Sequence, residues 1–125
     1  MPADIDFLGE FLVRNFRNTA TGCVRGLCRE EFDSPGHREY QELIQMLSDE
    51  QKEILQKVVK YCVEGALNDT LYRLDAELNK KKARIQILID SEPLATAGAP
   101  STLHSRLWGP QGWLIRYQQV SGPSK

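Results

Sequence analysis

The sequence predicts an α+β fold, in which N-terminal helices pack around one long central helix and a small C-terminal antiparallel β-sheet follows. Two periodicities indicate this order. Apolar residues recur at three- and four-residue steps up to a lysine triplet at residues 80–82, and then alternate every second residue between Gly- and Pro-rich turns. We expect a single domain over residues 1–125, with a helical part at 4–82, a β part at 84–119 and a frayed tail at 120–125.

The central helix is predicted over about residues 48–82. Ser48 and Gln51 match a capping box, in which each side chain accepts the other residue's backbone amide. Gly65 weakens a helix by about 1 kcal/mol relative to alanine, and close approach of another helix is the simplest reason for it. The apolar stripe predicts one face buried in the core, formed by Leu55, Val58, Val59, Cys62, Val63, Ala66, Leu67, Leu71, Leu74 and Leu78.

Polar residues interrupt the central helix at Asn68, Asp69 and Asp75. Their positions relative to Leu67 and Leu71 favour the solvated side of the helix, and the alternative is the lining of a cleft.

The first helix is predicted from Asp4 to about Asn18, with Asp4 or Asp6 as its N-cap. Its apolar face is expected in the core, because large apolar side chains usually lie inside; the alternative is an exposed patch for a partner. This face comprises Ile5, Phe7, Leu8, Phe11, Leu12 and Phe16.

Three further helical features are predicted before the central helix. Residues 19–32 are expected to be helical with a break near Thr21-Gly22, since both are poor helix formers. Asp33-Ser34-Pro35-Gly36 predicts a turn. A short helix over 37–47 then meets the central helix at a sharp turn.

The β part is predicted from two patterns. Ile85, Ile87 and Ile89 alternate with polar residues, which indicates a strand at 84–90, although a continuing helix also fits. Residues 92–102 read as a loop. Gly109 to Gly112 (Gly-Pro-Gln-Gly) separates two short extended segments, so we expect a hairpin there.

Charge and targeting signals exclude several classes. Sixteen basic against seventeen acidic residues give a net charge of −1, which disfavours binding to a polyanion. The acidic N-terminus does not resemble a signal peptide, and no apolar run reaches the roughly twenty residues that cross a bilayer. Three cysteines in such a chain favour free thiols in the cytoplasm. We therefore expect a cytoplasmic protein that does not enter membranes.

No chemical motif predicts a catalytic, metal or cofactor site. Cys23 and Cys28 are five residues apart without a second pair, which is not a structural zinc pattern; buried thiols in a helical core are the expectation for them and for Cys62. The sequence contains no Gly-rich phosphate loop or Walker pattern, and no His-Glu-x-x-His or calcium-loop motif.

The function that we expect is a small non-catalytic protein-interaction module, acting as a homodimer or as the partner of a larger protein. Phe7, Phe11, Trp108 and Trp113 are the candidate contact residues, the tryptophans because they flank the predicted hairpin turn, although a cross-strand core pair is the commoner use of such tryptophans.

Two alternatives remain. The first is a small enzyme or ligand-binding domain with a pocket between the long helix and the C-terminal sheet, lined by Asn68, Tyr72, His104 and Arg116. The second is weak nucleic-acid binding through basic residues, namely Arg14, Arg17, Arg25, Arg29, Lys80, Lys81, Lys82 and Arg84.

Overall fold

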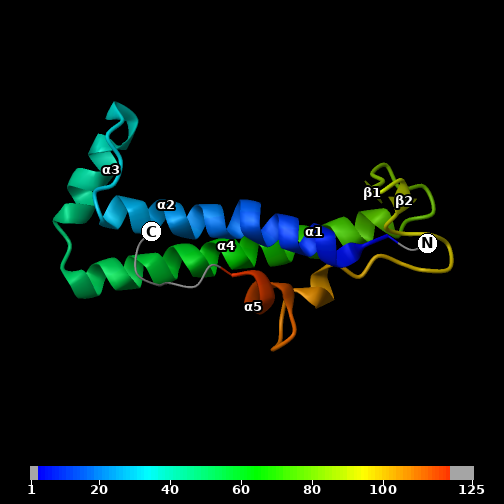
Figure 1. Ribbon diagram of the computed structural model, residues 1–125. Coiled ribbons are helices and arrows are strands. Elements are labelled where there is room, and N and C mark those ends of the chain that lie inside the picture. The colour runs from blue at the N-terminus through cyan, green and yellow to red at the C-terminus, as the bar shows by residue number, and fades with distance from the viewer. Residues whose placement is uncertain (1–2, 119–125) are drawn as a thin grey trace.

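The structure, a computed structural model, describes residues 3–118 (Figure 1). It is mostly helical, with a two-stranded antiparallel sheet toward the C-terminus, so the predicted α+β class is confirmed. The elements in chain order are α1 (Ile5–Leu12), the π-helical turn η1 (Val13–Arg17), α2 (Asn18–Cys28), α3 (Pro35–Gln45), α4 (Asp49–Leu78), β1 (Leu88–Ile89), β2 (Glu92–Pro93), the 3-10 turn η2 (His104–Arg106) and α5 (Trp113–Tyr117).

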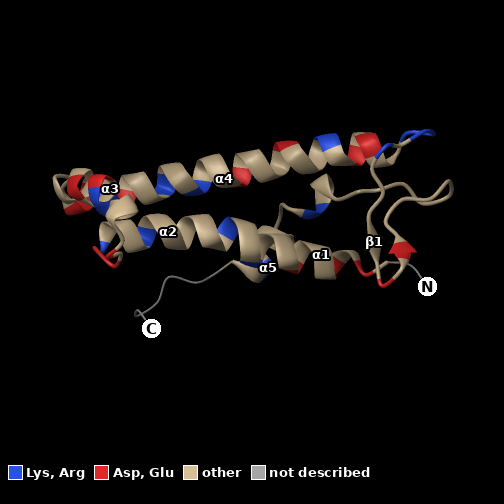
Figure 2. Cartoon of the chain, turned by 90° about the horizontal axis from the view of Figure 1, so that it is seen from above, with Lys and Arg blue, Asp and Glu red and all other residues tan. Residues whose placement is uncertain are grey.

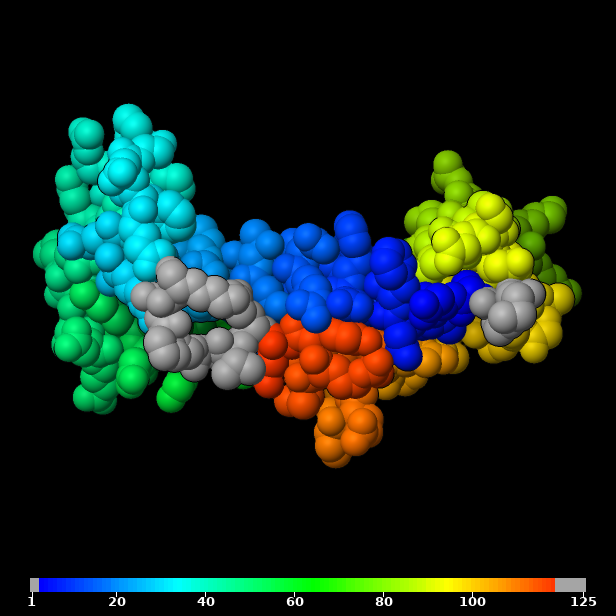
Figure 3. Space-filling model, viewed as in Figure 1, coloured from blue at the N-terminus to red at the C-terminus, as the bar shows by residue number. Residues whose placement is uncertain are grey.

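Two long helical rods dominate the molecule. The first is the uninterrupted run of α1, η1 and α2, and the second is α4, which lies beside it in the opposite direction (Figures 1 and 2). The segment with η2 and α5 packs along one side of the rods. At opposite ends, α3 and the β1–β2 turn both rise from the other side, so that the molecule is shaped like a saddle (Figures 1 and 3).

The first rod begins as predicted and continues further than predicted. The Asp4 carboxylate caps it by accepting the Phe7 backbone N–H at 3.2 Å. The expected break near Thr21-Gly22 is wrong, because the helix runs on to Cys28 and its contact with α4 outweighs weak local propensity. The irregular turn is instead η1, where the Asn18 N–H donates to the carbonyl of Val13, five residues back.

Side-chain caps begin α3 and α4; the cap of α4 was predicted, whereas Pro35 and Gly36 of the predicted turn belong to α3. Ser34 caps α3, with Pro35 as its first residue, so the helix covers 35–45 rather than 37–47. Ser48 caps α4 with the full capping box: the Gln51 N–H donates to Ser48 Oγ at 3.1 Å, and the Ser48 N–H donates to Gln51 Oε1 at 2.8 Å.

The central helix ends at Leu78 and not at Lys82. The side chain of the next residue, Asn79, is turned toward the C-terminal loop, where it donates to the Ser101 carbonyl at 3.0 Å and accepts the Ser101 N–H at 2.6 Å. These bonds hold the loop against the helix end. Gly65 lies in open space, so the close helix approach expected there is wrong.

Only the C-terminal half of the predicted α4 stripe reaches the core. Leu67, Leu71 and Leu78 are buried, whereas Val58 and Cys62 are exposed. The C-terminal segment covers the first group and leaves the second uncovered. The core cluster consists of Val13, Leu67, Leu71, Leu78, Ile89, Leu94, Leu103, Leu107, Trp113 and Leu114.

The sheet is smaller than predicted, and its turn lies elsewhere. Of the expected strand at 84–90, Leu88–Ile89 forms β1, paired with Glu92–Pro93 across a turn at Asp90 and Ser91. The hairpin expected at Gly109–Gly112 is wrong, because residues 113–117 form α5. Trp113 and Leu114 are adjacent in the sequence and both buried. One helical turn permits this, whereas a strand with one face in solvent would expose one of them.

The position of Trp113 explains why residue 9 is glycine and why three phenylalanines lie outside the core. Its ring lies directly against the backbone of Gly9, where any Cβ atom would overlap it. The core position predicted for the phenylalanines is therefore filled from α5, and Phe7, Phe11 and Phe16 remain 57%, 55% and 48% exposed. The predicted frayed tail at 120–125 lies outside the described residues.

Candidate functional site

An apolar groove lies in the angle where α3 meets α2 and α4. It has a volume of about 560 Å³ and almost no polar surface. We call it the apolar groove; its lining is Ala20, Cys23, Val24 and Leu27 from α2, Tyr40, Leu43, Ile44 and Leu47 from α3 and its end, and Leu55 and Val59 from α4.

Part of the wall of the apolar groove is exposed although it carries core-type side chains. Leu43 is 63% exposed, and Tyr40 and the flanking Val58 are about half exposed. Their helical spacing would suit a buried face, but no segment among residues 3–118 covers them. Monomeric proteins rarely leave large contiguous apolar patches open, and such patches commonly mark interaction sites.

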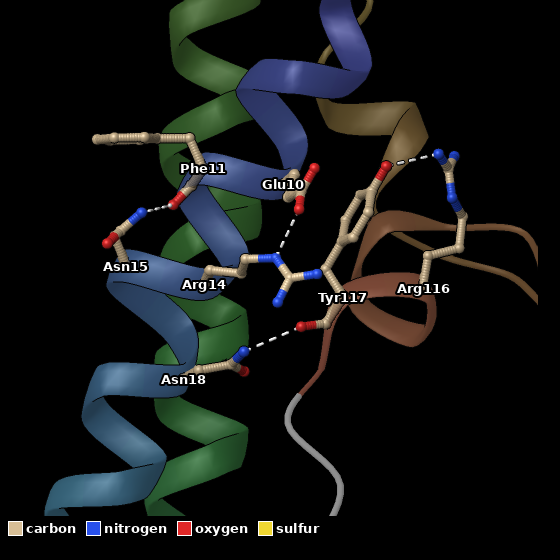
Figure 4. A network of polar contacts seen from close by, with 7 residues as sticks. All are labelled: Glu10, Phe11, Arg14, Asn15, Asn18, Arg116 and Tyr117. Atoms are coloured by element: carbon tan, nitrogen blue, oxygen red, sulfur yellow. Dashed lines mark hydrogen bonds and ion pairs between the residues drawn. The ribbon is translucent and has the colours of Figure 1, made fainter.

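A phenylalanine ridge, formed by Phe7, Phe11 and Phe16, continues the same apolar line along the first rod. In a regular helix, residues five apart do not share a face, but a π-helical turn adds one residue between them. Phe16 lies within η1, whose wider turn carries it back toward the face of Phe7 and Phe11, and all three rings are exposed. Figure 4 shows Phe11 on the opposite side of the rod from Tyr117 of α5.

The four contact residues predicted from the sequence differ in their exposure. Phe7 and Phe11 are exposed on the ridge, as the interaction hypothesis requires. Trp113 is only 1% exposed and forms part of the core instead. Trp108 is 49% exposed, with its Nε1–H donating to Asn68 Oδ1 at 2.7 Å.

The four predicted pocket residues are engaged in separate contacts. Asn68 holds Trp108, and the Tyr72 and His104 rings meet edge to face with centroids 5.3 Å apart. Arg116 instead contacts the first rod, where its guanidinium lies 3.5 Å from the Asp6 carboxylate and donates to the Tyr117 hydroxyl at 2.6 Å (Figure 4).

Asp75 anchors the C-terminal segment, and its placement on the solvated side of α4 is wrong. Its carboxylate accepts three hydrogen bonds, from Ser101 Oγ at 2.5 Å and from the backbone N–H groups of Leu103 and His104 at 2.8 and 2.9 Å. The interruption of the apolar pattern was the available signal, and cleft lining was the alternative that it left open.

A buried polar cluster joins the two rods, and sequence reasoning missed it. Arg17 Nε donates to Glu64 Oε2 at 3.0 Å, with side chains 5% and 14% exposed. Arg17 Nη1 also donates to Asn18 Oδ1, and Asn18 Nδ2 donates to the Tyr117 carbonyl at 2.9 Å (Figure 4). The π-helical turn orients these residues inward, and no local pattern in the sequence marks it.

Two carboxylates, Asp6 and Glu77, have lowered pKa values. The indole N–H of Trp113, with smaller help from Arg116, lowers the pKa of Asp6. The backbone N–H of Arg84 and the ammonium of Lys80 lower the pKa of Glu77. Both carboxylates stabilise packing contacts, and neither faces the apolar groove.

The cysteines do not occupy the buried positions that were expected. Cys23 and Cys62 are exposed and Cys28 is partly buried, and all three are free thiols. Burial raises the pKa of Cys28, which disfavours its reactive thiolate. Cys23 lies in the apolar groove, where it supplies a chemical probe of that surface.

The predicted basic residues are distributed around the molecule. Arg14 pairs with Glu10 and Arg17 with Glu64, so these two cations are neutralised by neighbours. Lys80, Lys81 and Lys82 cluster at the end of α4 (Figure 2), where Lys80 pairs with Glu77.

Within residues 3–118, His, Cys, Asp and Glu side chains do not gather in threes at any place that could hold a metal ion, and none of the helices combines the length and the apolar character needed to cross a membrane. Comparison with protein-family models, with curated proteins and with solved structures gave no match.

Proposed function

We propose that the protein is a small, non-catalytic protein-interaction module of the cytoplasm, and that it binds its partner through the apolar groove. The observation that carries the proposal is the groove's composition: three helices present core-type side chains to open space. A cytoplasmic location accords with three free thiols, which a reducing compartment preserves.

The shape and chemistry of the groove fit a helical partner. Its walls are helices, and its side chains follow three- and four-residue steps, as in grooves that receive the apolar face of an amphipathic helix. Burying Leu43, Tyr40 and Val58 against such a helix would contribute roughly 25 cal/mol per Å² of apolar surface. The lining contains no charged side chain, so the binding energy comes from apolar contact.

Affinity capture from the native host, with matched variants, tests this function. Leu43→Asp charges the groove at a residue that is already 63% exposed, so we expect the fold to persist and the captured proteins to be lost. Ile115→Asp is the control, because Ile115 is 54% exposed on α5, outside the groove. Retention of the same proteins by both variants would contradict the proposal.

A further inference from the structure

We propose that the occupant of the apolar groove is a second copy of this chain, related by a two-fold axis, with the phenylalanine ridge of each copy seated in the groove of the other. This inference rests on the proposed function and names its partner. It follows from the positions of ridge and groove, from their combined area and from the charge of the chain.

Ridge and groove lie along one line of the first rod. Beyond Phe16, the helical steps of four, three and four residues lead to Ala20, Cys23 and Leu27, which are the α2 wall of the groove. Phe11 precedes Cys23 by twelve residues, which is about 18 Å along a helix. The protruding and the hollow part of the surface are therefore separated along the rod and open on the same side.

A two-fold rotation brings these two parts together twice. In such an interface, if residue i of one copy meets residue j of the other, then j also meets i. Reversing the rod direction places Phe7 and Phe11 of one copy opposite the groove end of its partner, and the same contact repeats at the other end. A lone helix in the groove would leave the ridge exposed, whereas a second copy covers both.

The available area is close to what a stable dimer requires. A fully exposed aromatic residue presents roughly 200 Å², so three half-exposed phenylalanines contribute about 300 Å². Tyr40, Leu43 and Val58, at 55%, 63% and 50% exposure, contribute a similar amount. The total, on the order of 600 Å² per copy before the rim is counted, approaches the roughly 800 Å² per partner of standard interfaces.

Charge does not oppose this association. Each copy carries a formal net charge of −1, so two copies meet with little repulsion over their whole surface. The ridge itself contains no ion that would be left unpaired, since the nearest cation, Arg14, is bonded to Glu10 at 2.7 Å on the side of the rod that faces Tyr117 (Figure 4).

Sedimentation of complementary variants tests the arrangement. Wild type is expected to sediment as a dimer, and Phe11→Glu or Leu43→Lys alone to weaken the dimer by about ten- to hundredfold, as charges in an apolar contact do. An equimolar mixture of these two variants is expected to restore a dimer. In that heterodimer one ridge contact pairs glutamate with lysine, and the other is wild type.

Each outcome decides the inference. Circular dichroism shows whether the variants keep their helices, and Ile115→Asp, which changes an exposed apolar residue on α5, should leave the dimer intact. A wild-type chain that stays monomeric at millimolar concentration overturns the inference, and so does a mixture that remains monomeric. If wild type is monomeric but Leu43→Asp still loses proteins that wild type captures from the host, self-association fails while the proposed function stands.

Discussion

Gly9 and Gly22 lie in the same helical rod, and alanine at the two positions should change stability in opposite directions. At Gly9 an added Cβ would overlap three ring atoms of Trp113, which is almost fully buried. At Gly22 the added atom meets nothing within 4 Å. The intrinsic helix preference is the same for both changes, so their difference isolates the contact with the indole ring.

The expected magnitudes follow from two opposing effects. Alanine stabilises a helix interior by about 1 kcal/mol relative to glycine, and inserting a methyl group into a packed core costs about 1–3 kcal/mol. Because the overlap at Gly9 involves the centre of a rigid ring, we expect Gly9→Ala to destabilise by about 1–2 kcal/mol. Gly22→Ala should stabilise by about 0.5–1 kcal/mol.

Urea unfolding, followed by tryptophan fluorescence and by circular dichroism, measures both changes. The two midpoints should move in opposite directions, and the emission of the Gly9→Ala variant should shift to the red as the ring becomes more exposed. Equal stability of the two variants would refute the packing of α5 against α1, and with it the reason why the phenylalanines are excluded from the core.

Three further predictions concern polar groups. Asp75→Ala removes three accepted hydrogen bonds and should destabilise the protein by about 2–3 kcal/mol in urea unfolding. The control is Asp69→Ala on the exposed side of the same helix, which should cost below about 0.5 kcal/mol. Arg17→Ala leaves Glu64 without its buried partner and should cost about 3–5 kcal/mol of stability. Arg14→Ala removes an exposed ion pair and should cost less than about 1 kcal/mol. Equal losses in the same unfolding assay would argue against the buried pair. The folded-state pKa of Asp6 is lowered, so its contribution to stability is present above the unfolded pKa and is lost as pH falls through the folded value. Wild type should therefore lose more stability than Asp6→Asn between pH 7 and pH 2. Parallel plots of unfolding free energy against pH for the two proteins would contradict this.

Local chemistry made part of the fold predictable. The cap of α4 depends on two residues three apart, Ser48 and Gln51, and was predicted; Ser34 and Pro35 were assigned to a turn, and the same local chemistry begins α3 two residues earlier than predicted. These bonds form within one turn of chain, so they can be read without knowing what packs on the helix. The order of helices before a small sheet followed from the change of period alone.

Long-range contacts determined what the sequence left open. The apolar stripe on α4 is continuous, but only the segment ending in α5 determines that Leu71 is covered and Val58 is not. Trp113 comes from the far end of the chain to pack on Gly9, whereas Phe7 and Phe11, which were expected in the core, remain exposed. The consecutive apolar residues at 113–115 depart from the alternation of a strand with one solvated face, and they were the available local sign against the hairpin.

The candidate site was found only in part for the same reason. Phe7 and Phe11 were chosen from composition and do lie exposed, but the ridge also needs Phe16, which only the π-helical turn brings into line. The groove depends on the angle between α3 and the two rods, and a loop of a few residues does not specify that angle.

The rate at which a maleimide labels Cys23 tests most directly whether the apolar groove is a binding surface. In a chain with Cys28→Ser and Cys62→Ser, Cys23 is the single thiol, and a second chain without native cysteines that carries Ser105→Cys on η2 supplies an exposed control. We predict that labelling of Cys23 slows as the protein is concentrated or as the captured host partner is added, while labelling at position 105 stays constant. Equal rates at Cys23 under all these conditions would contradict the account.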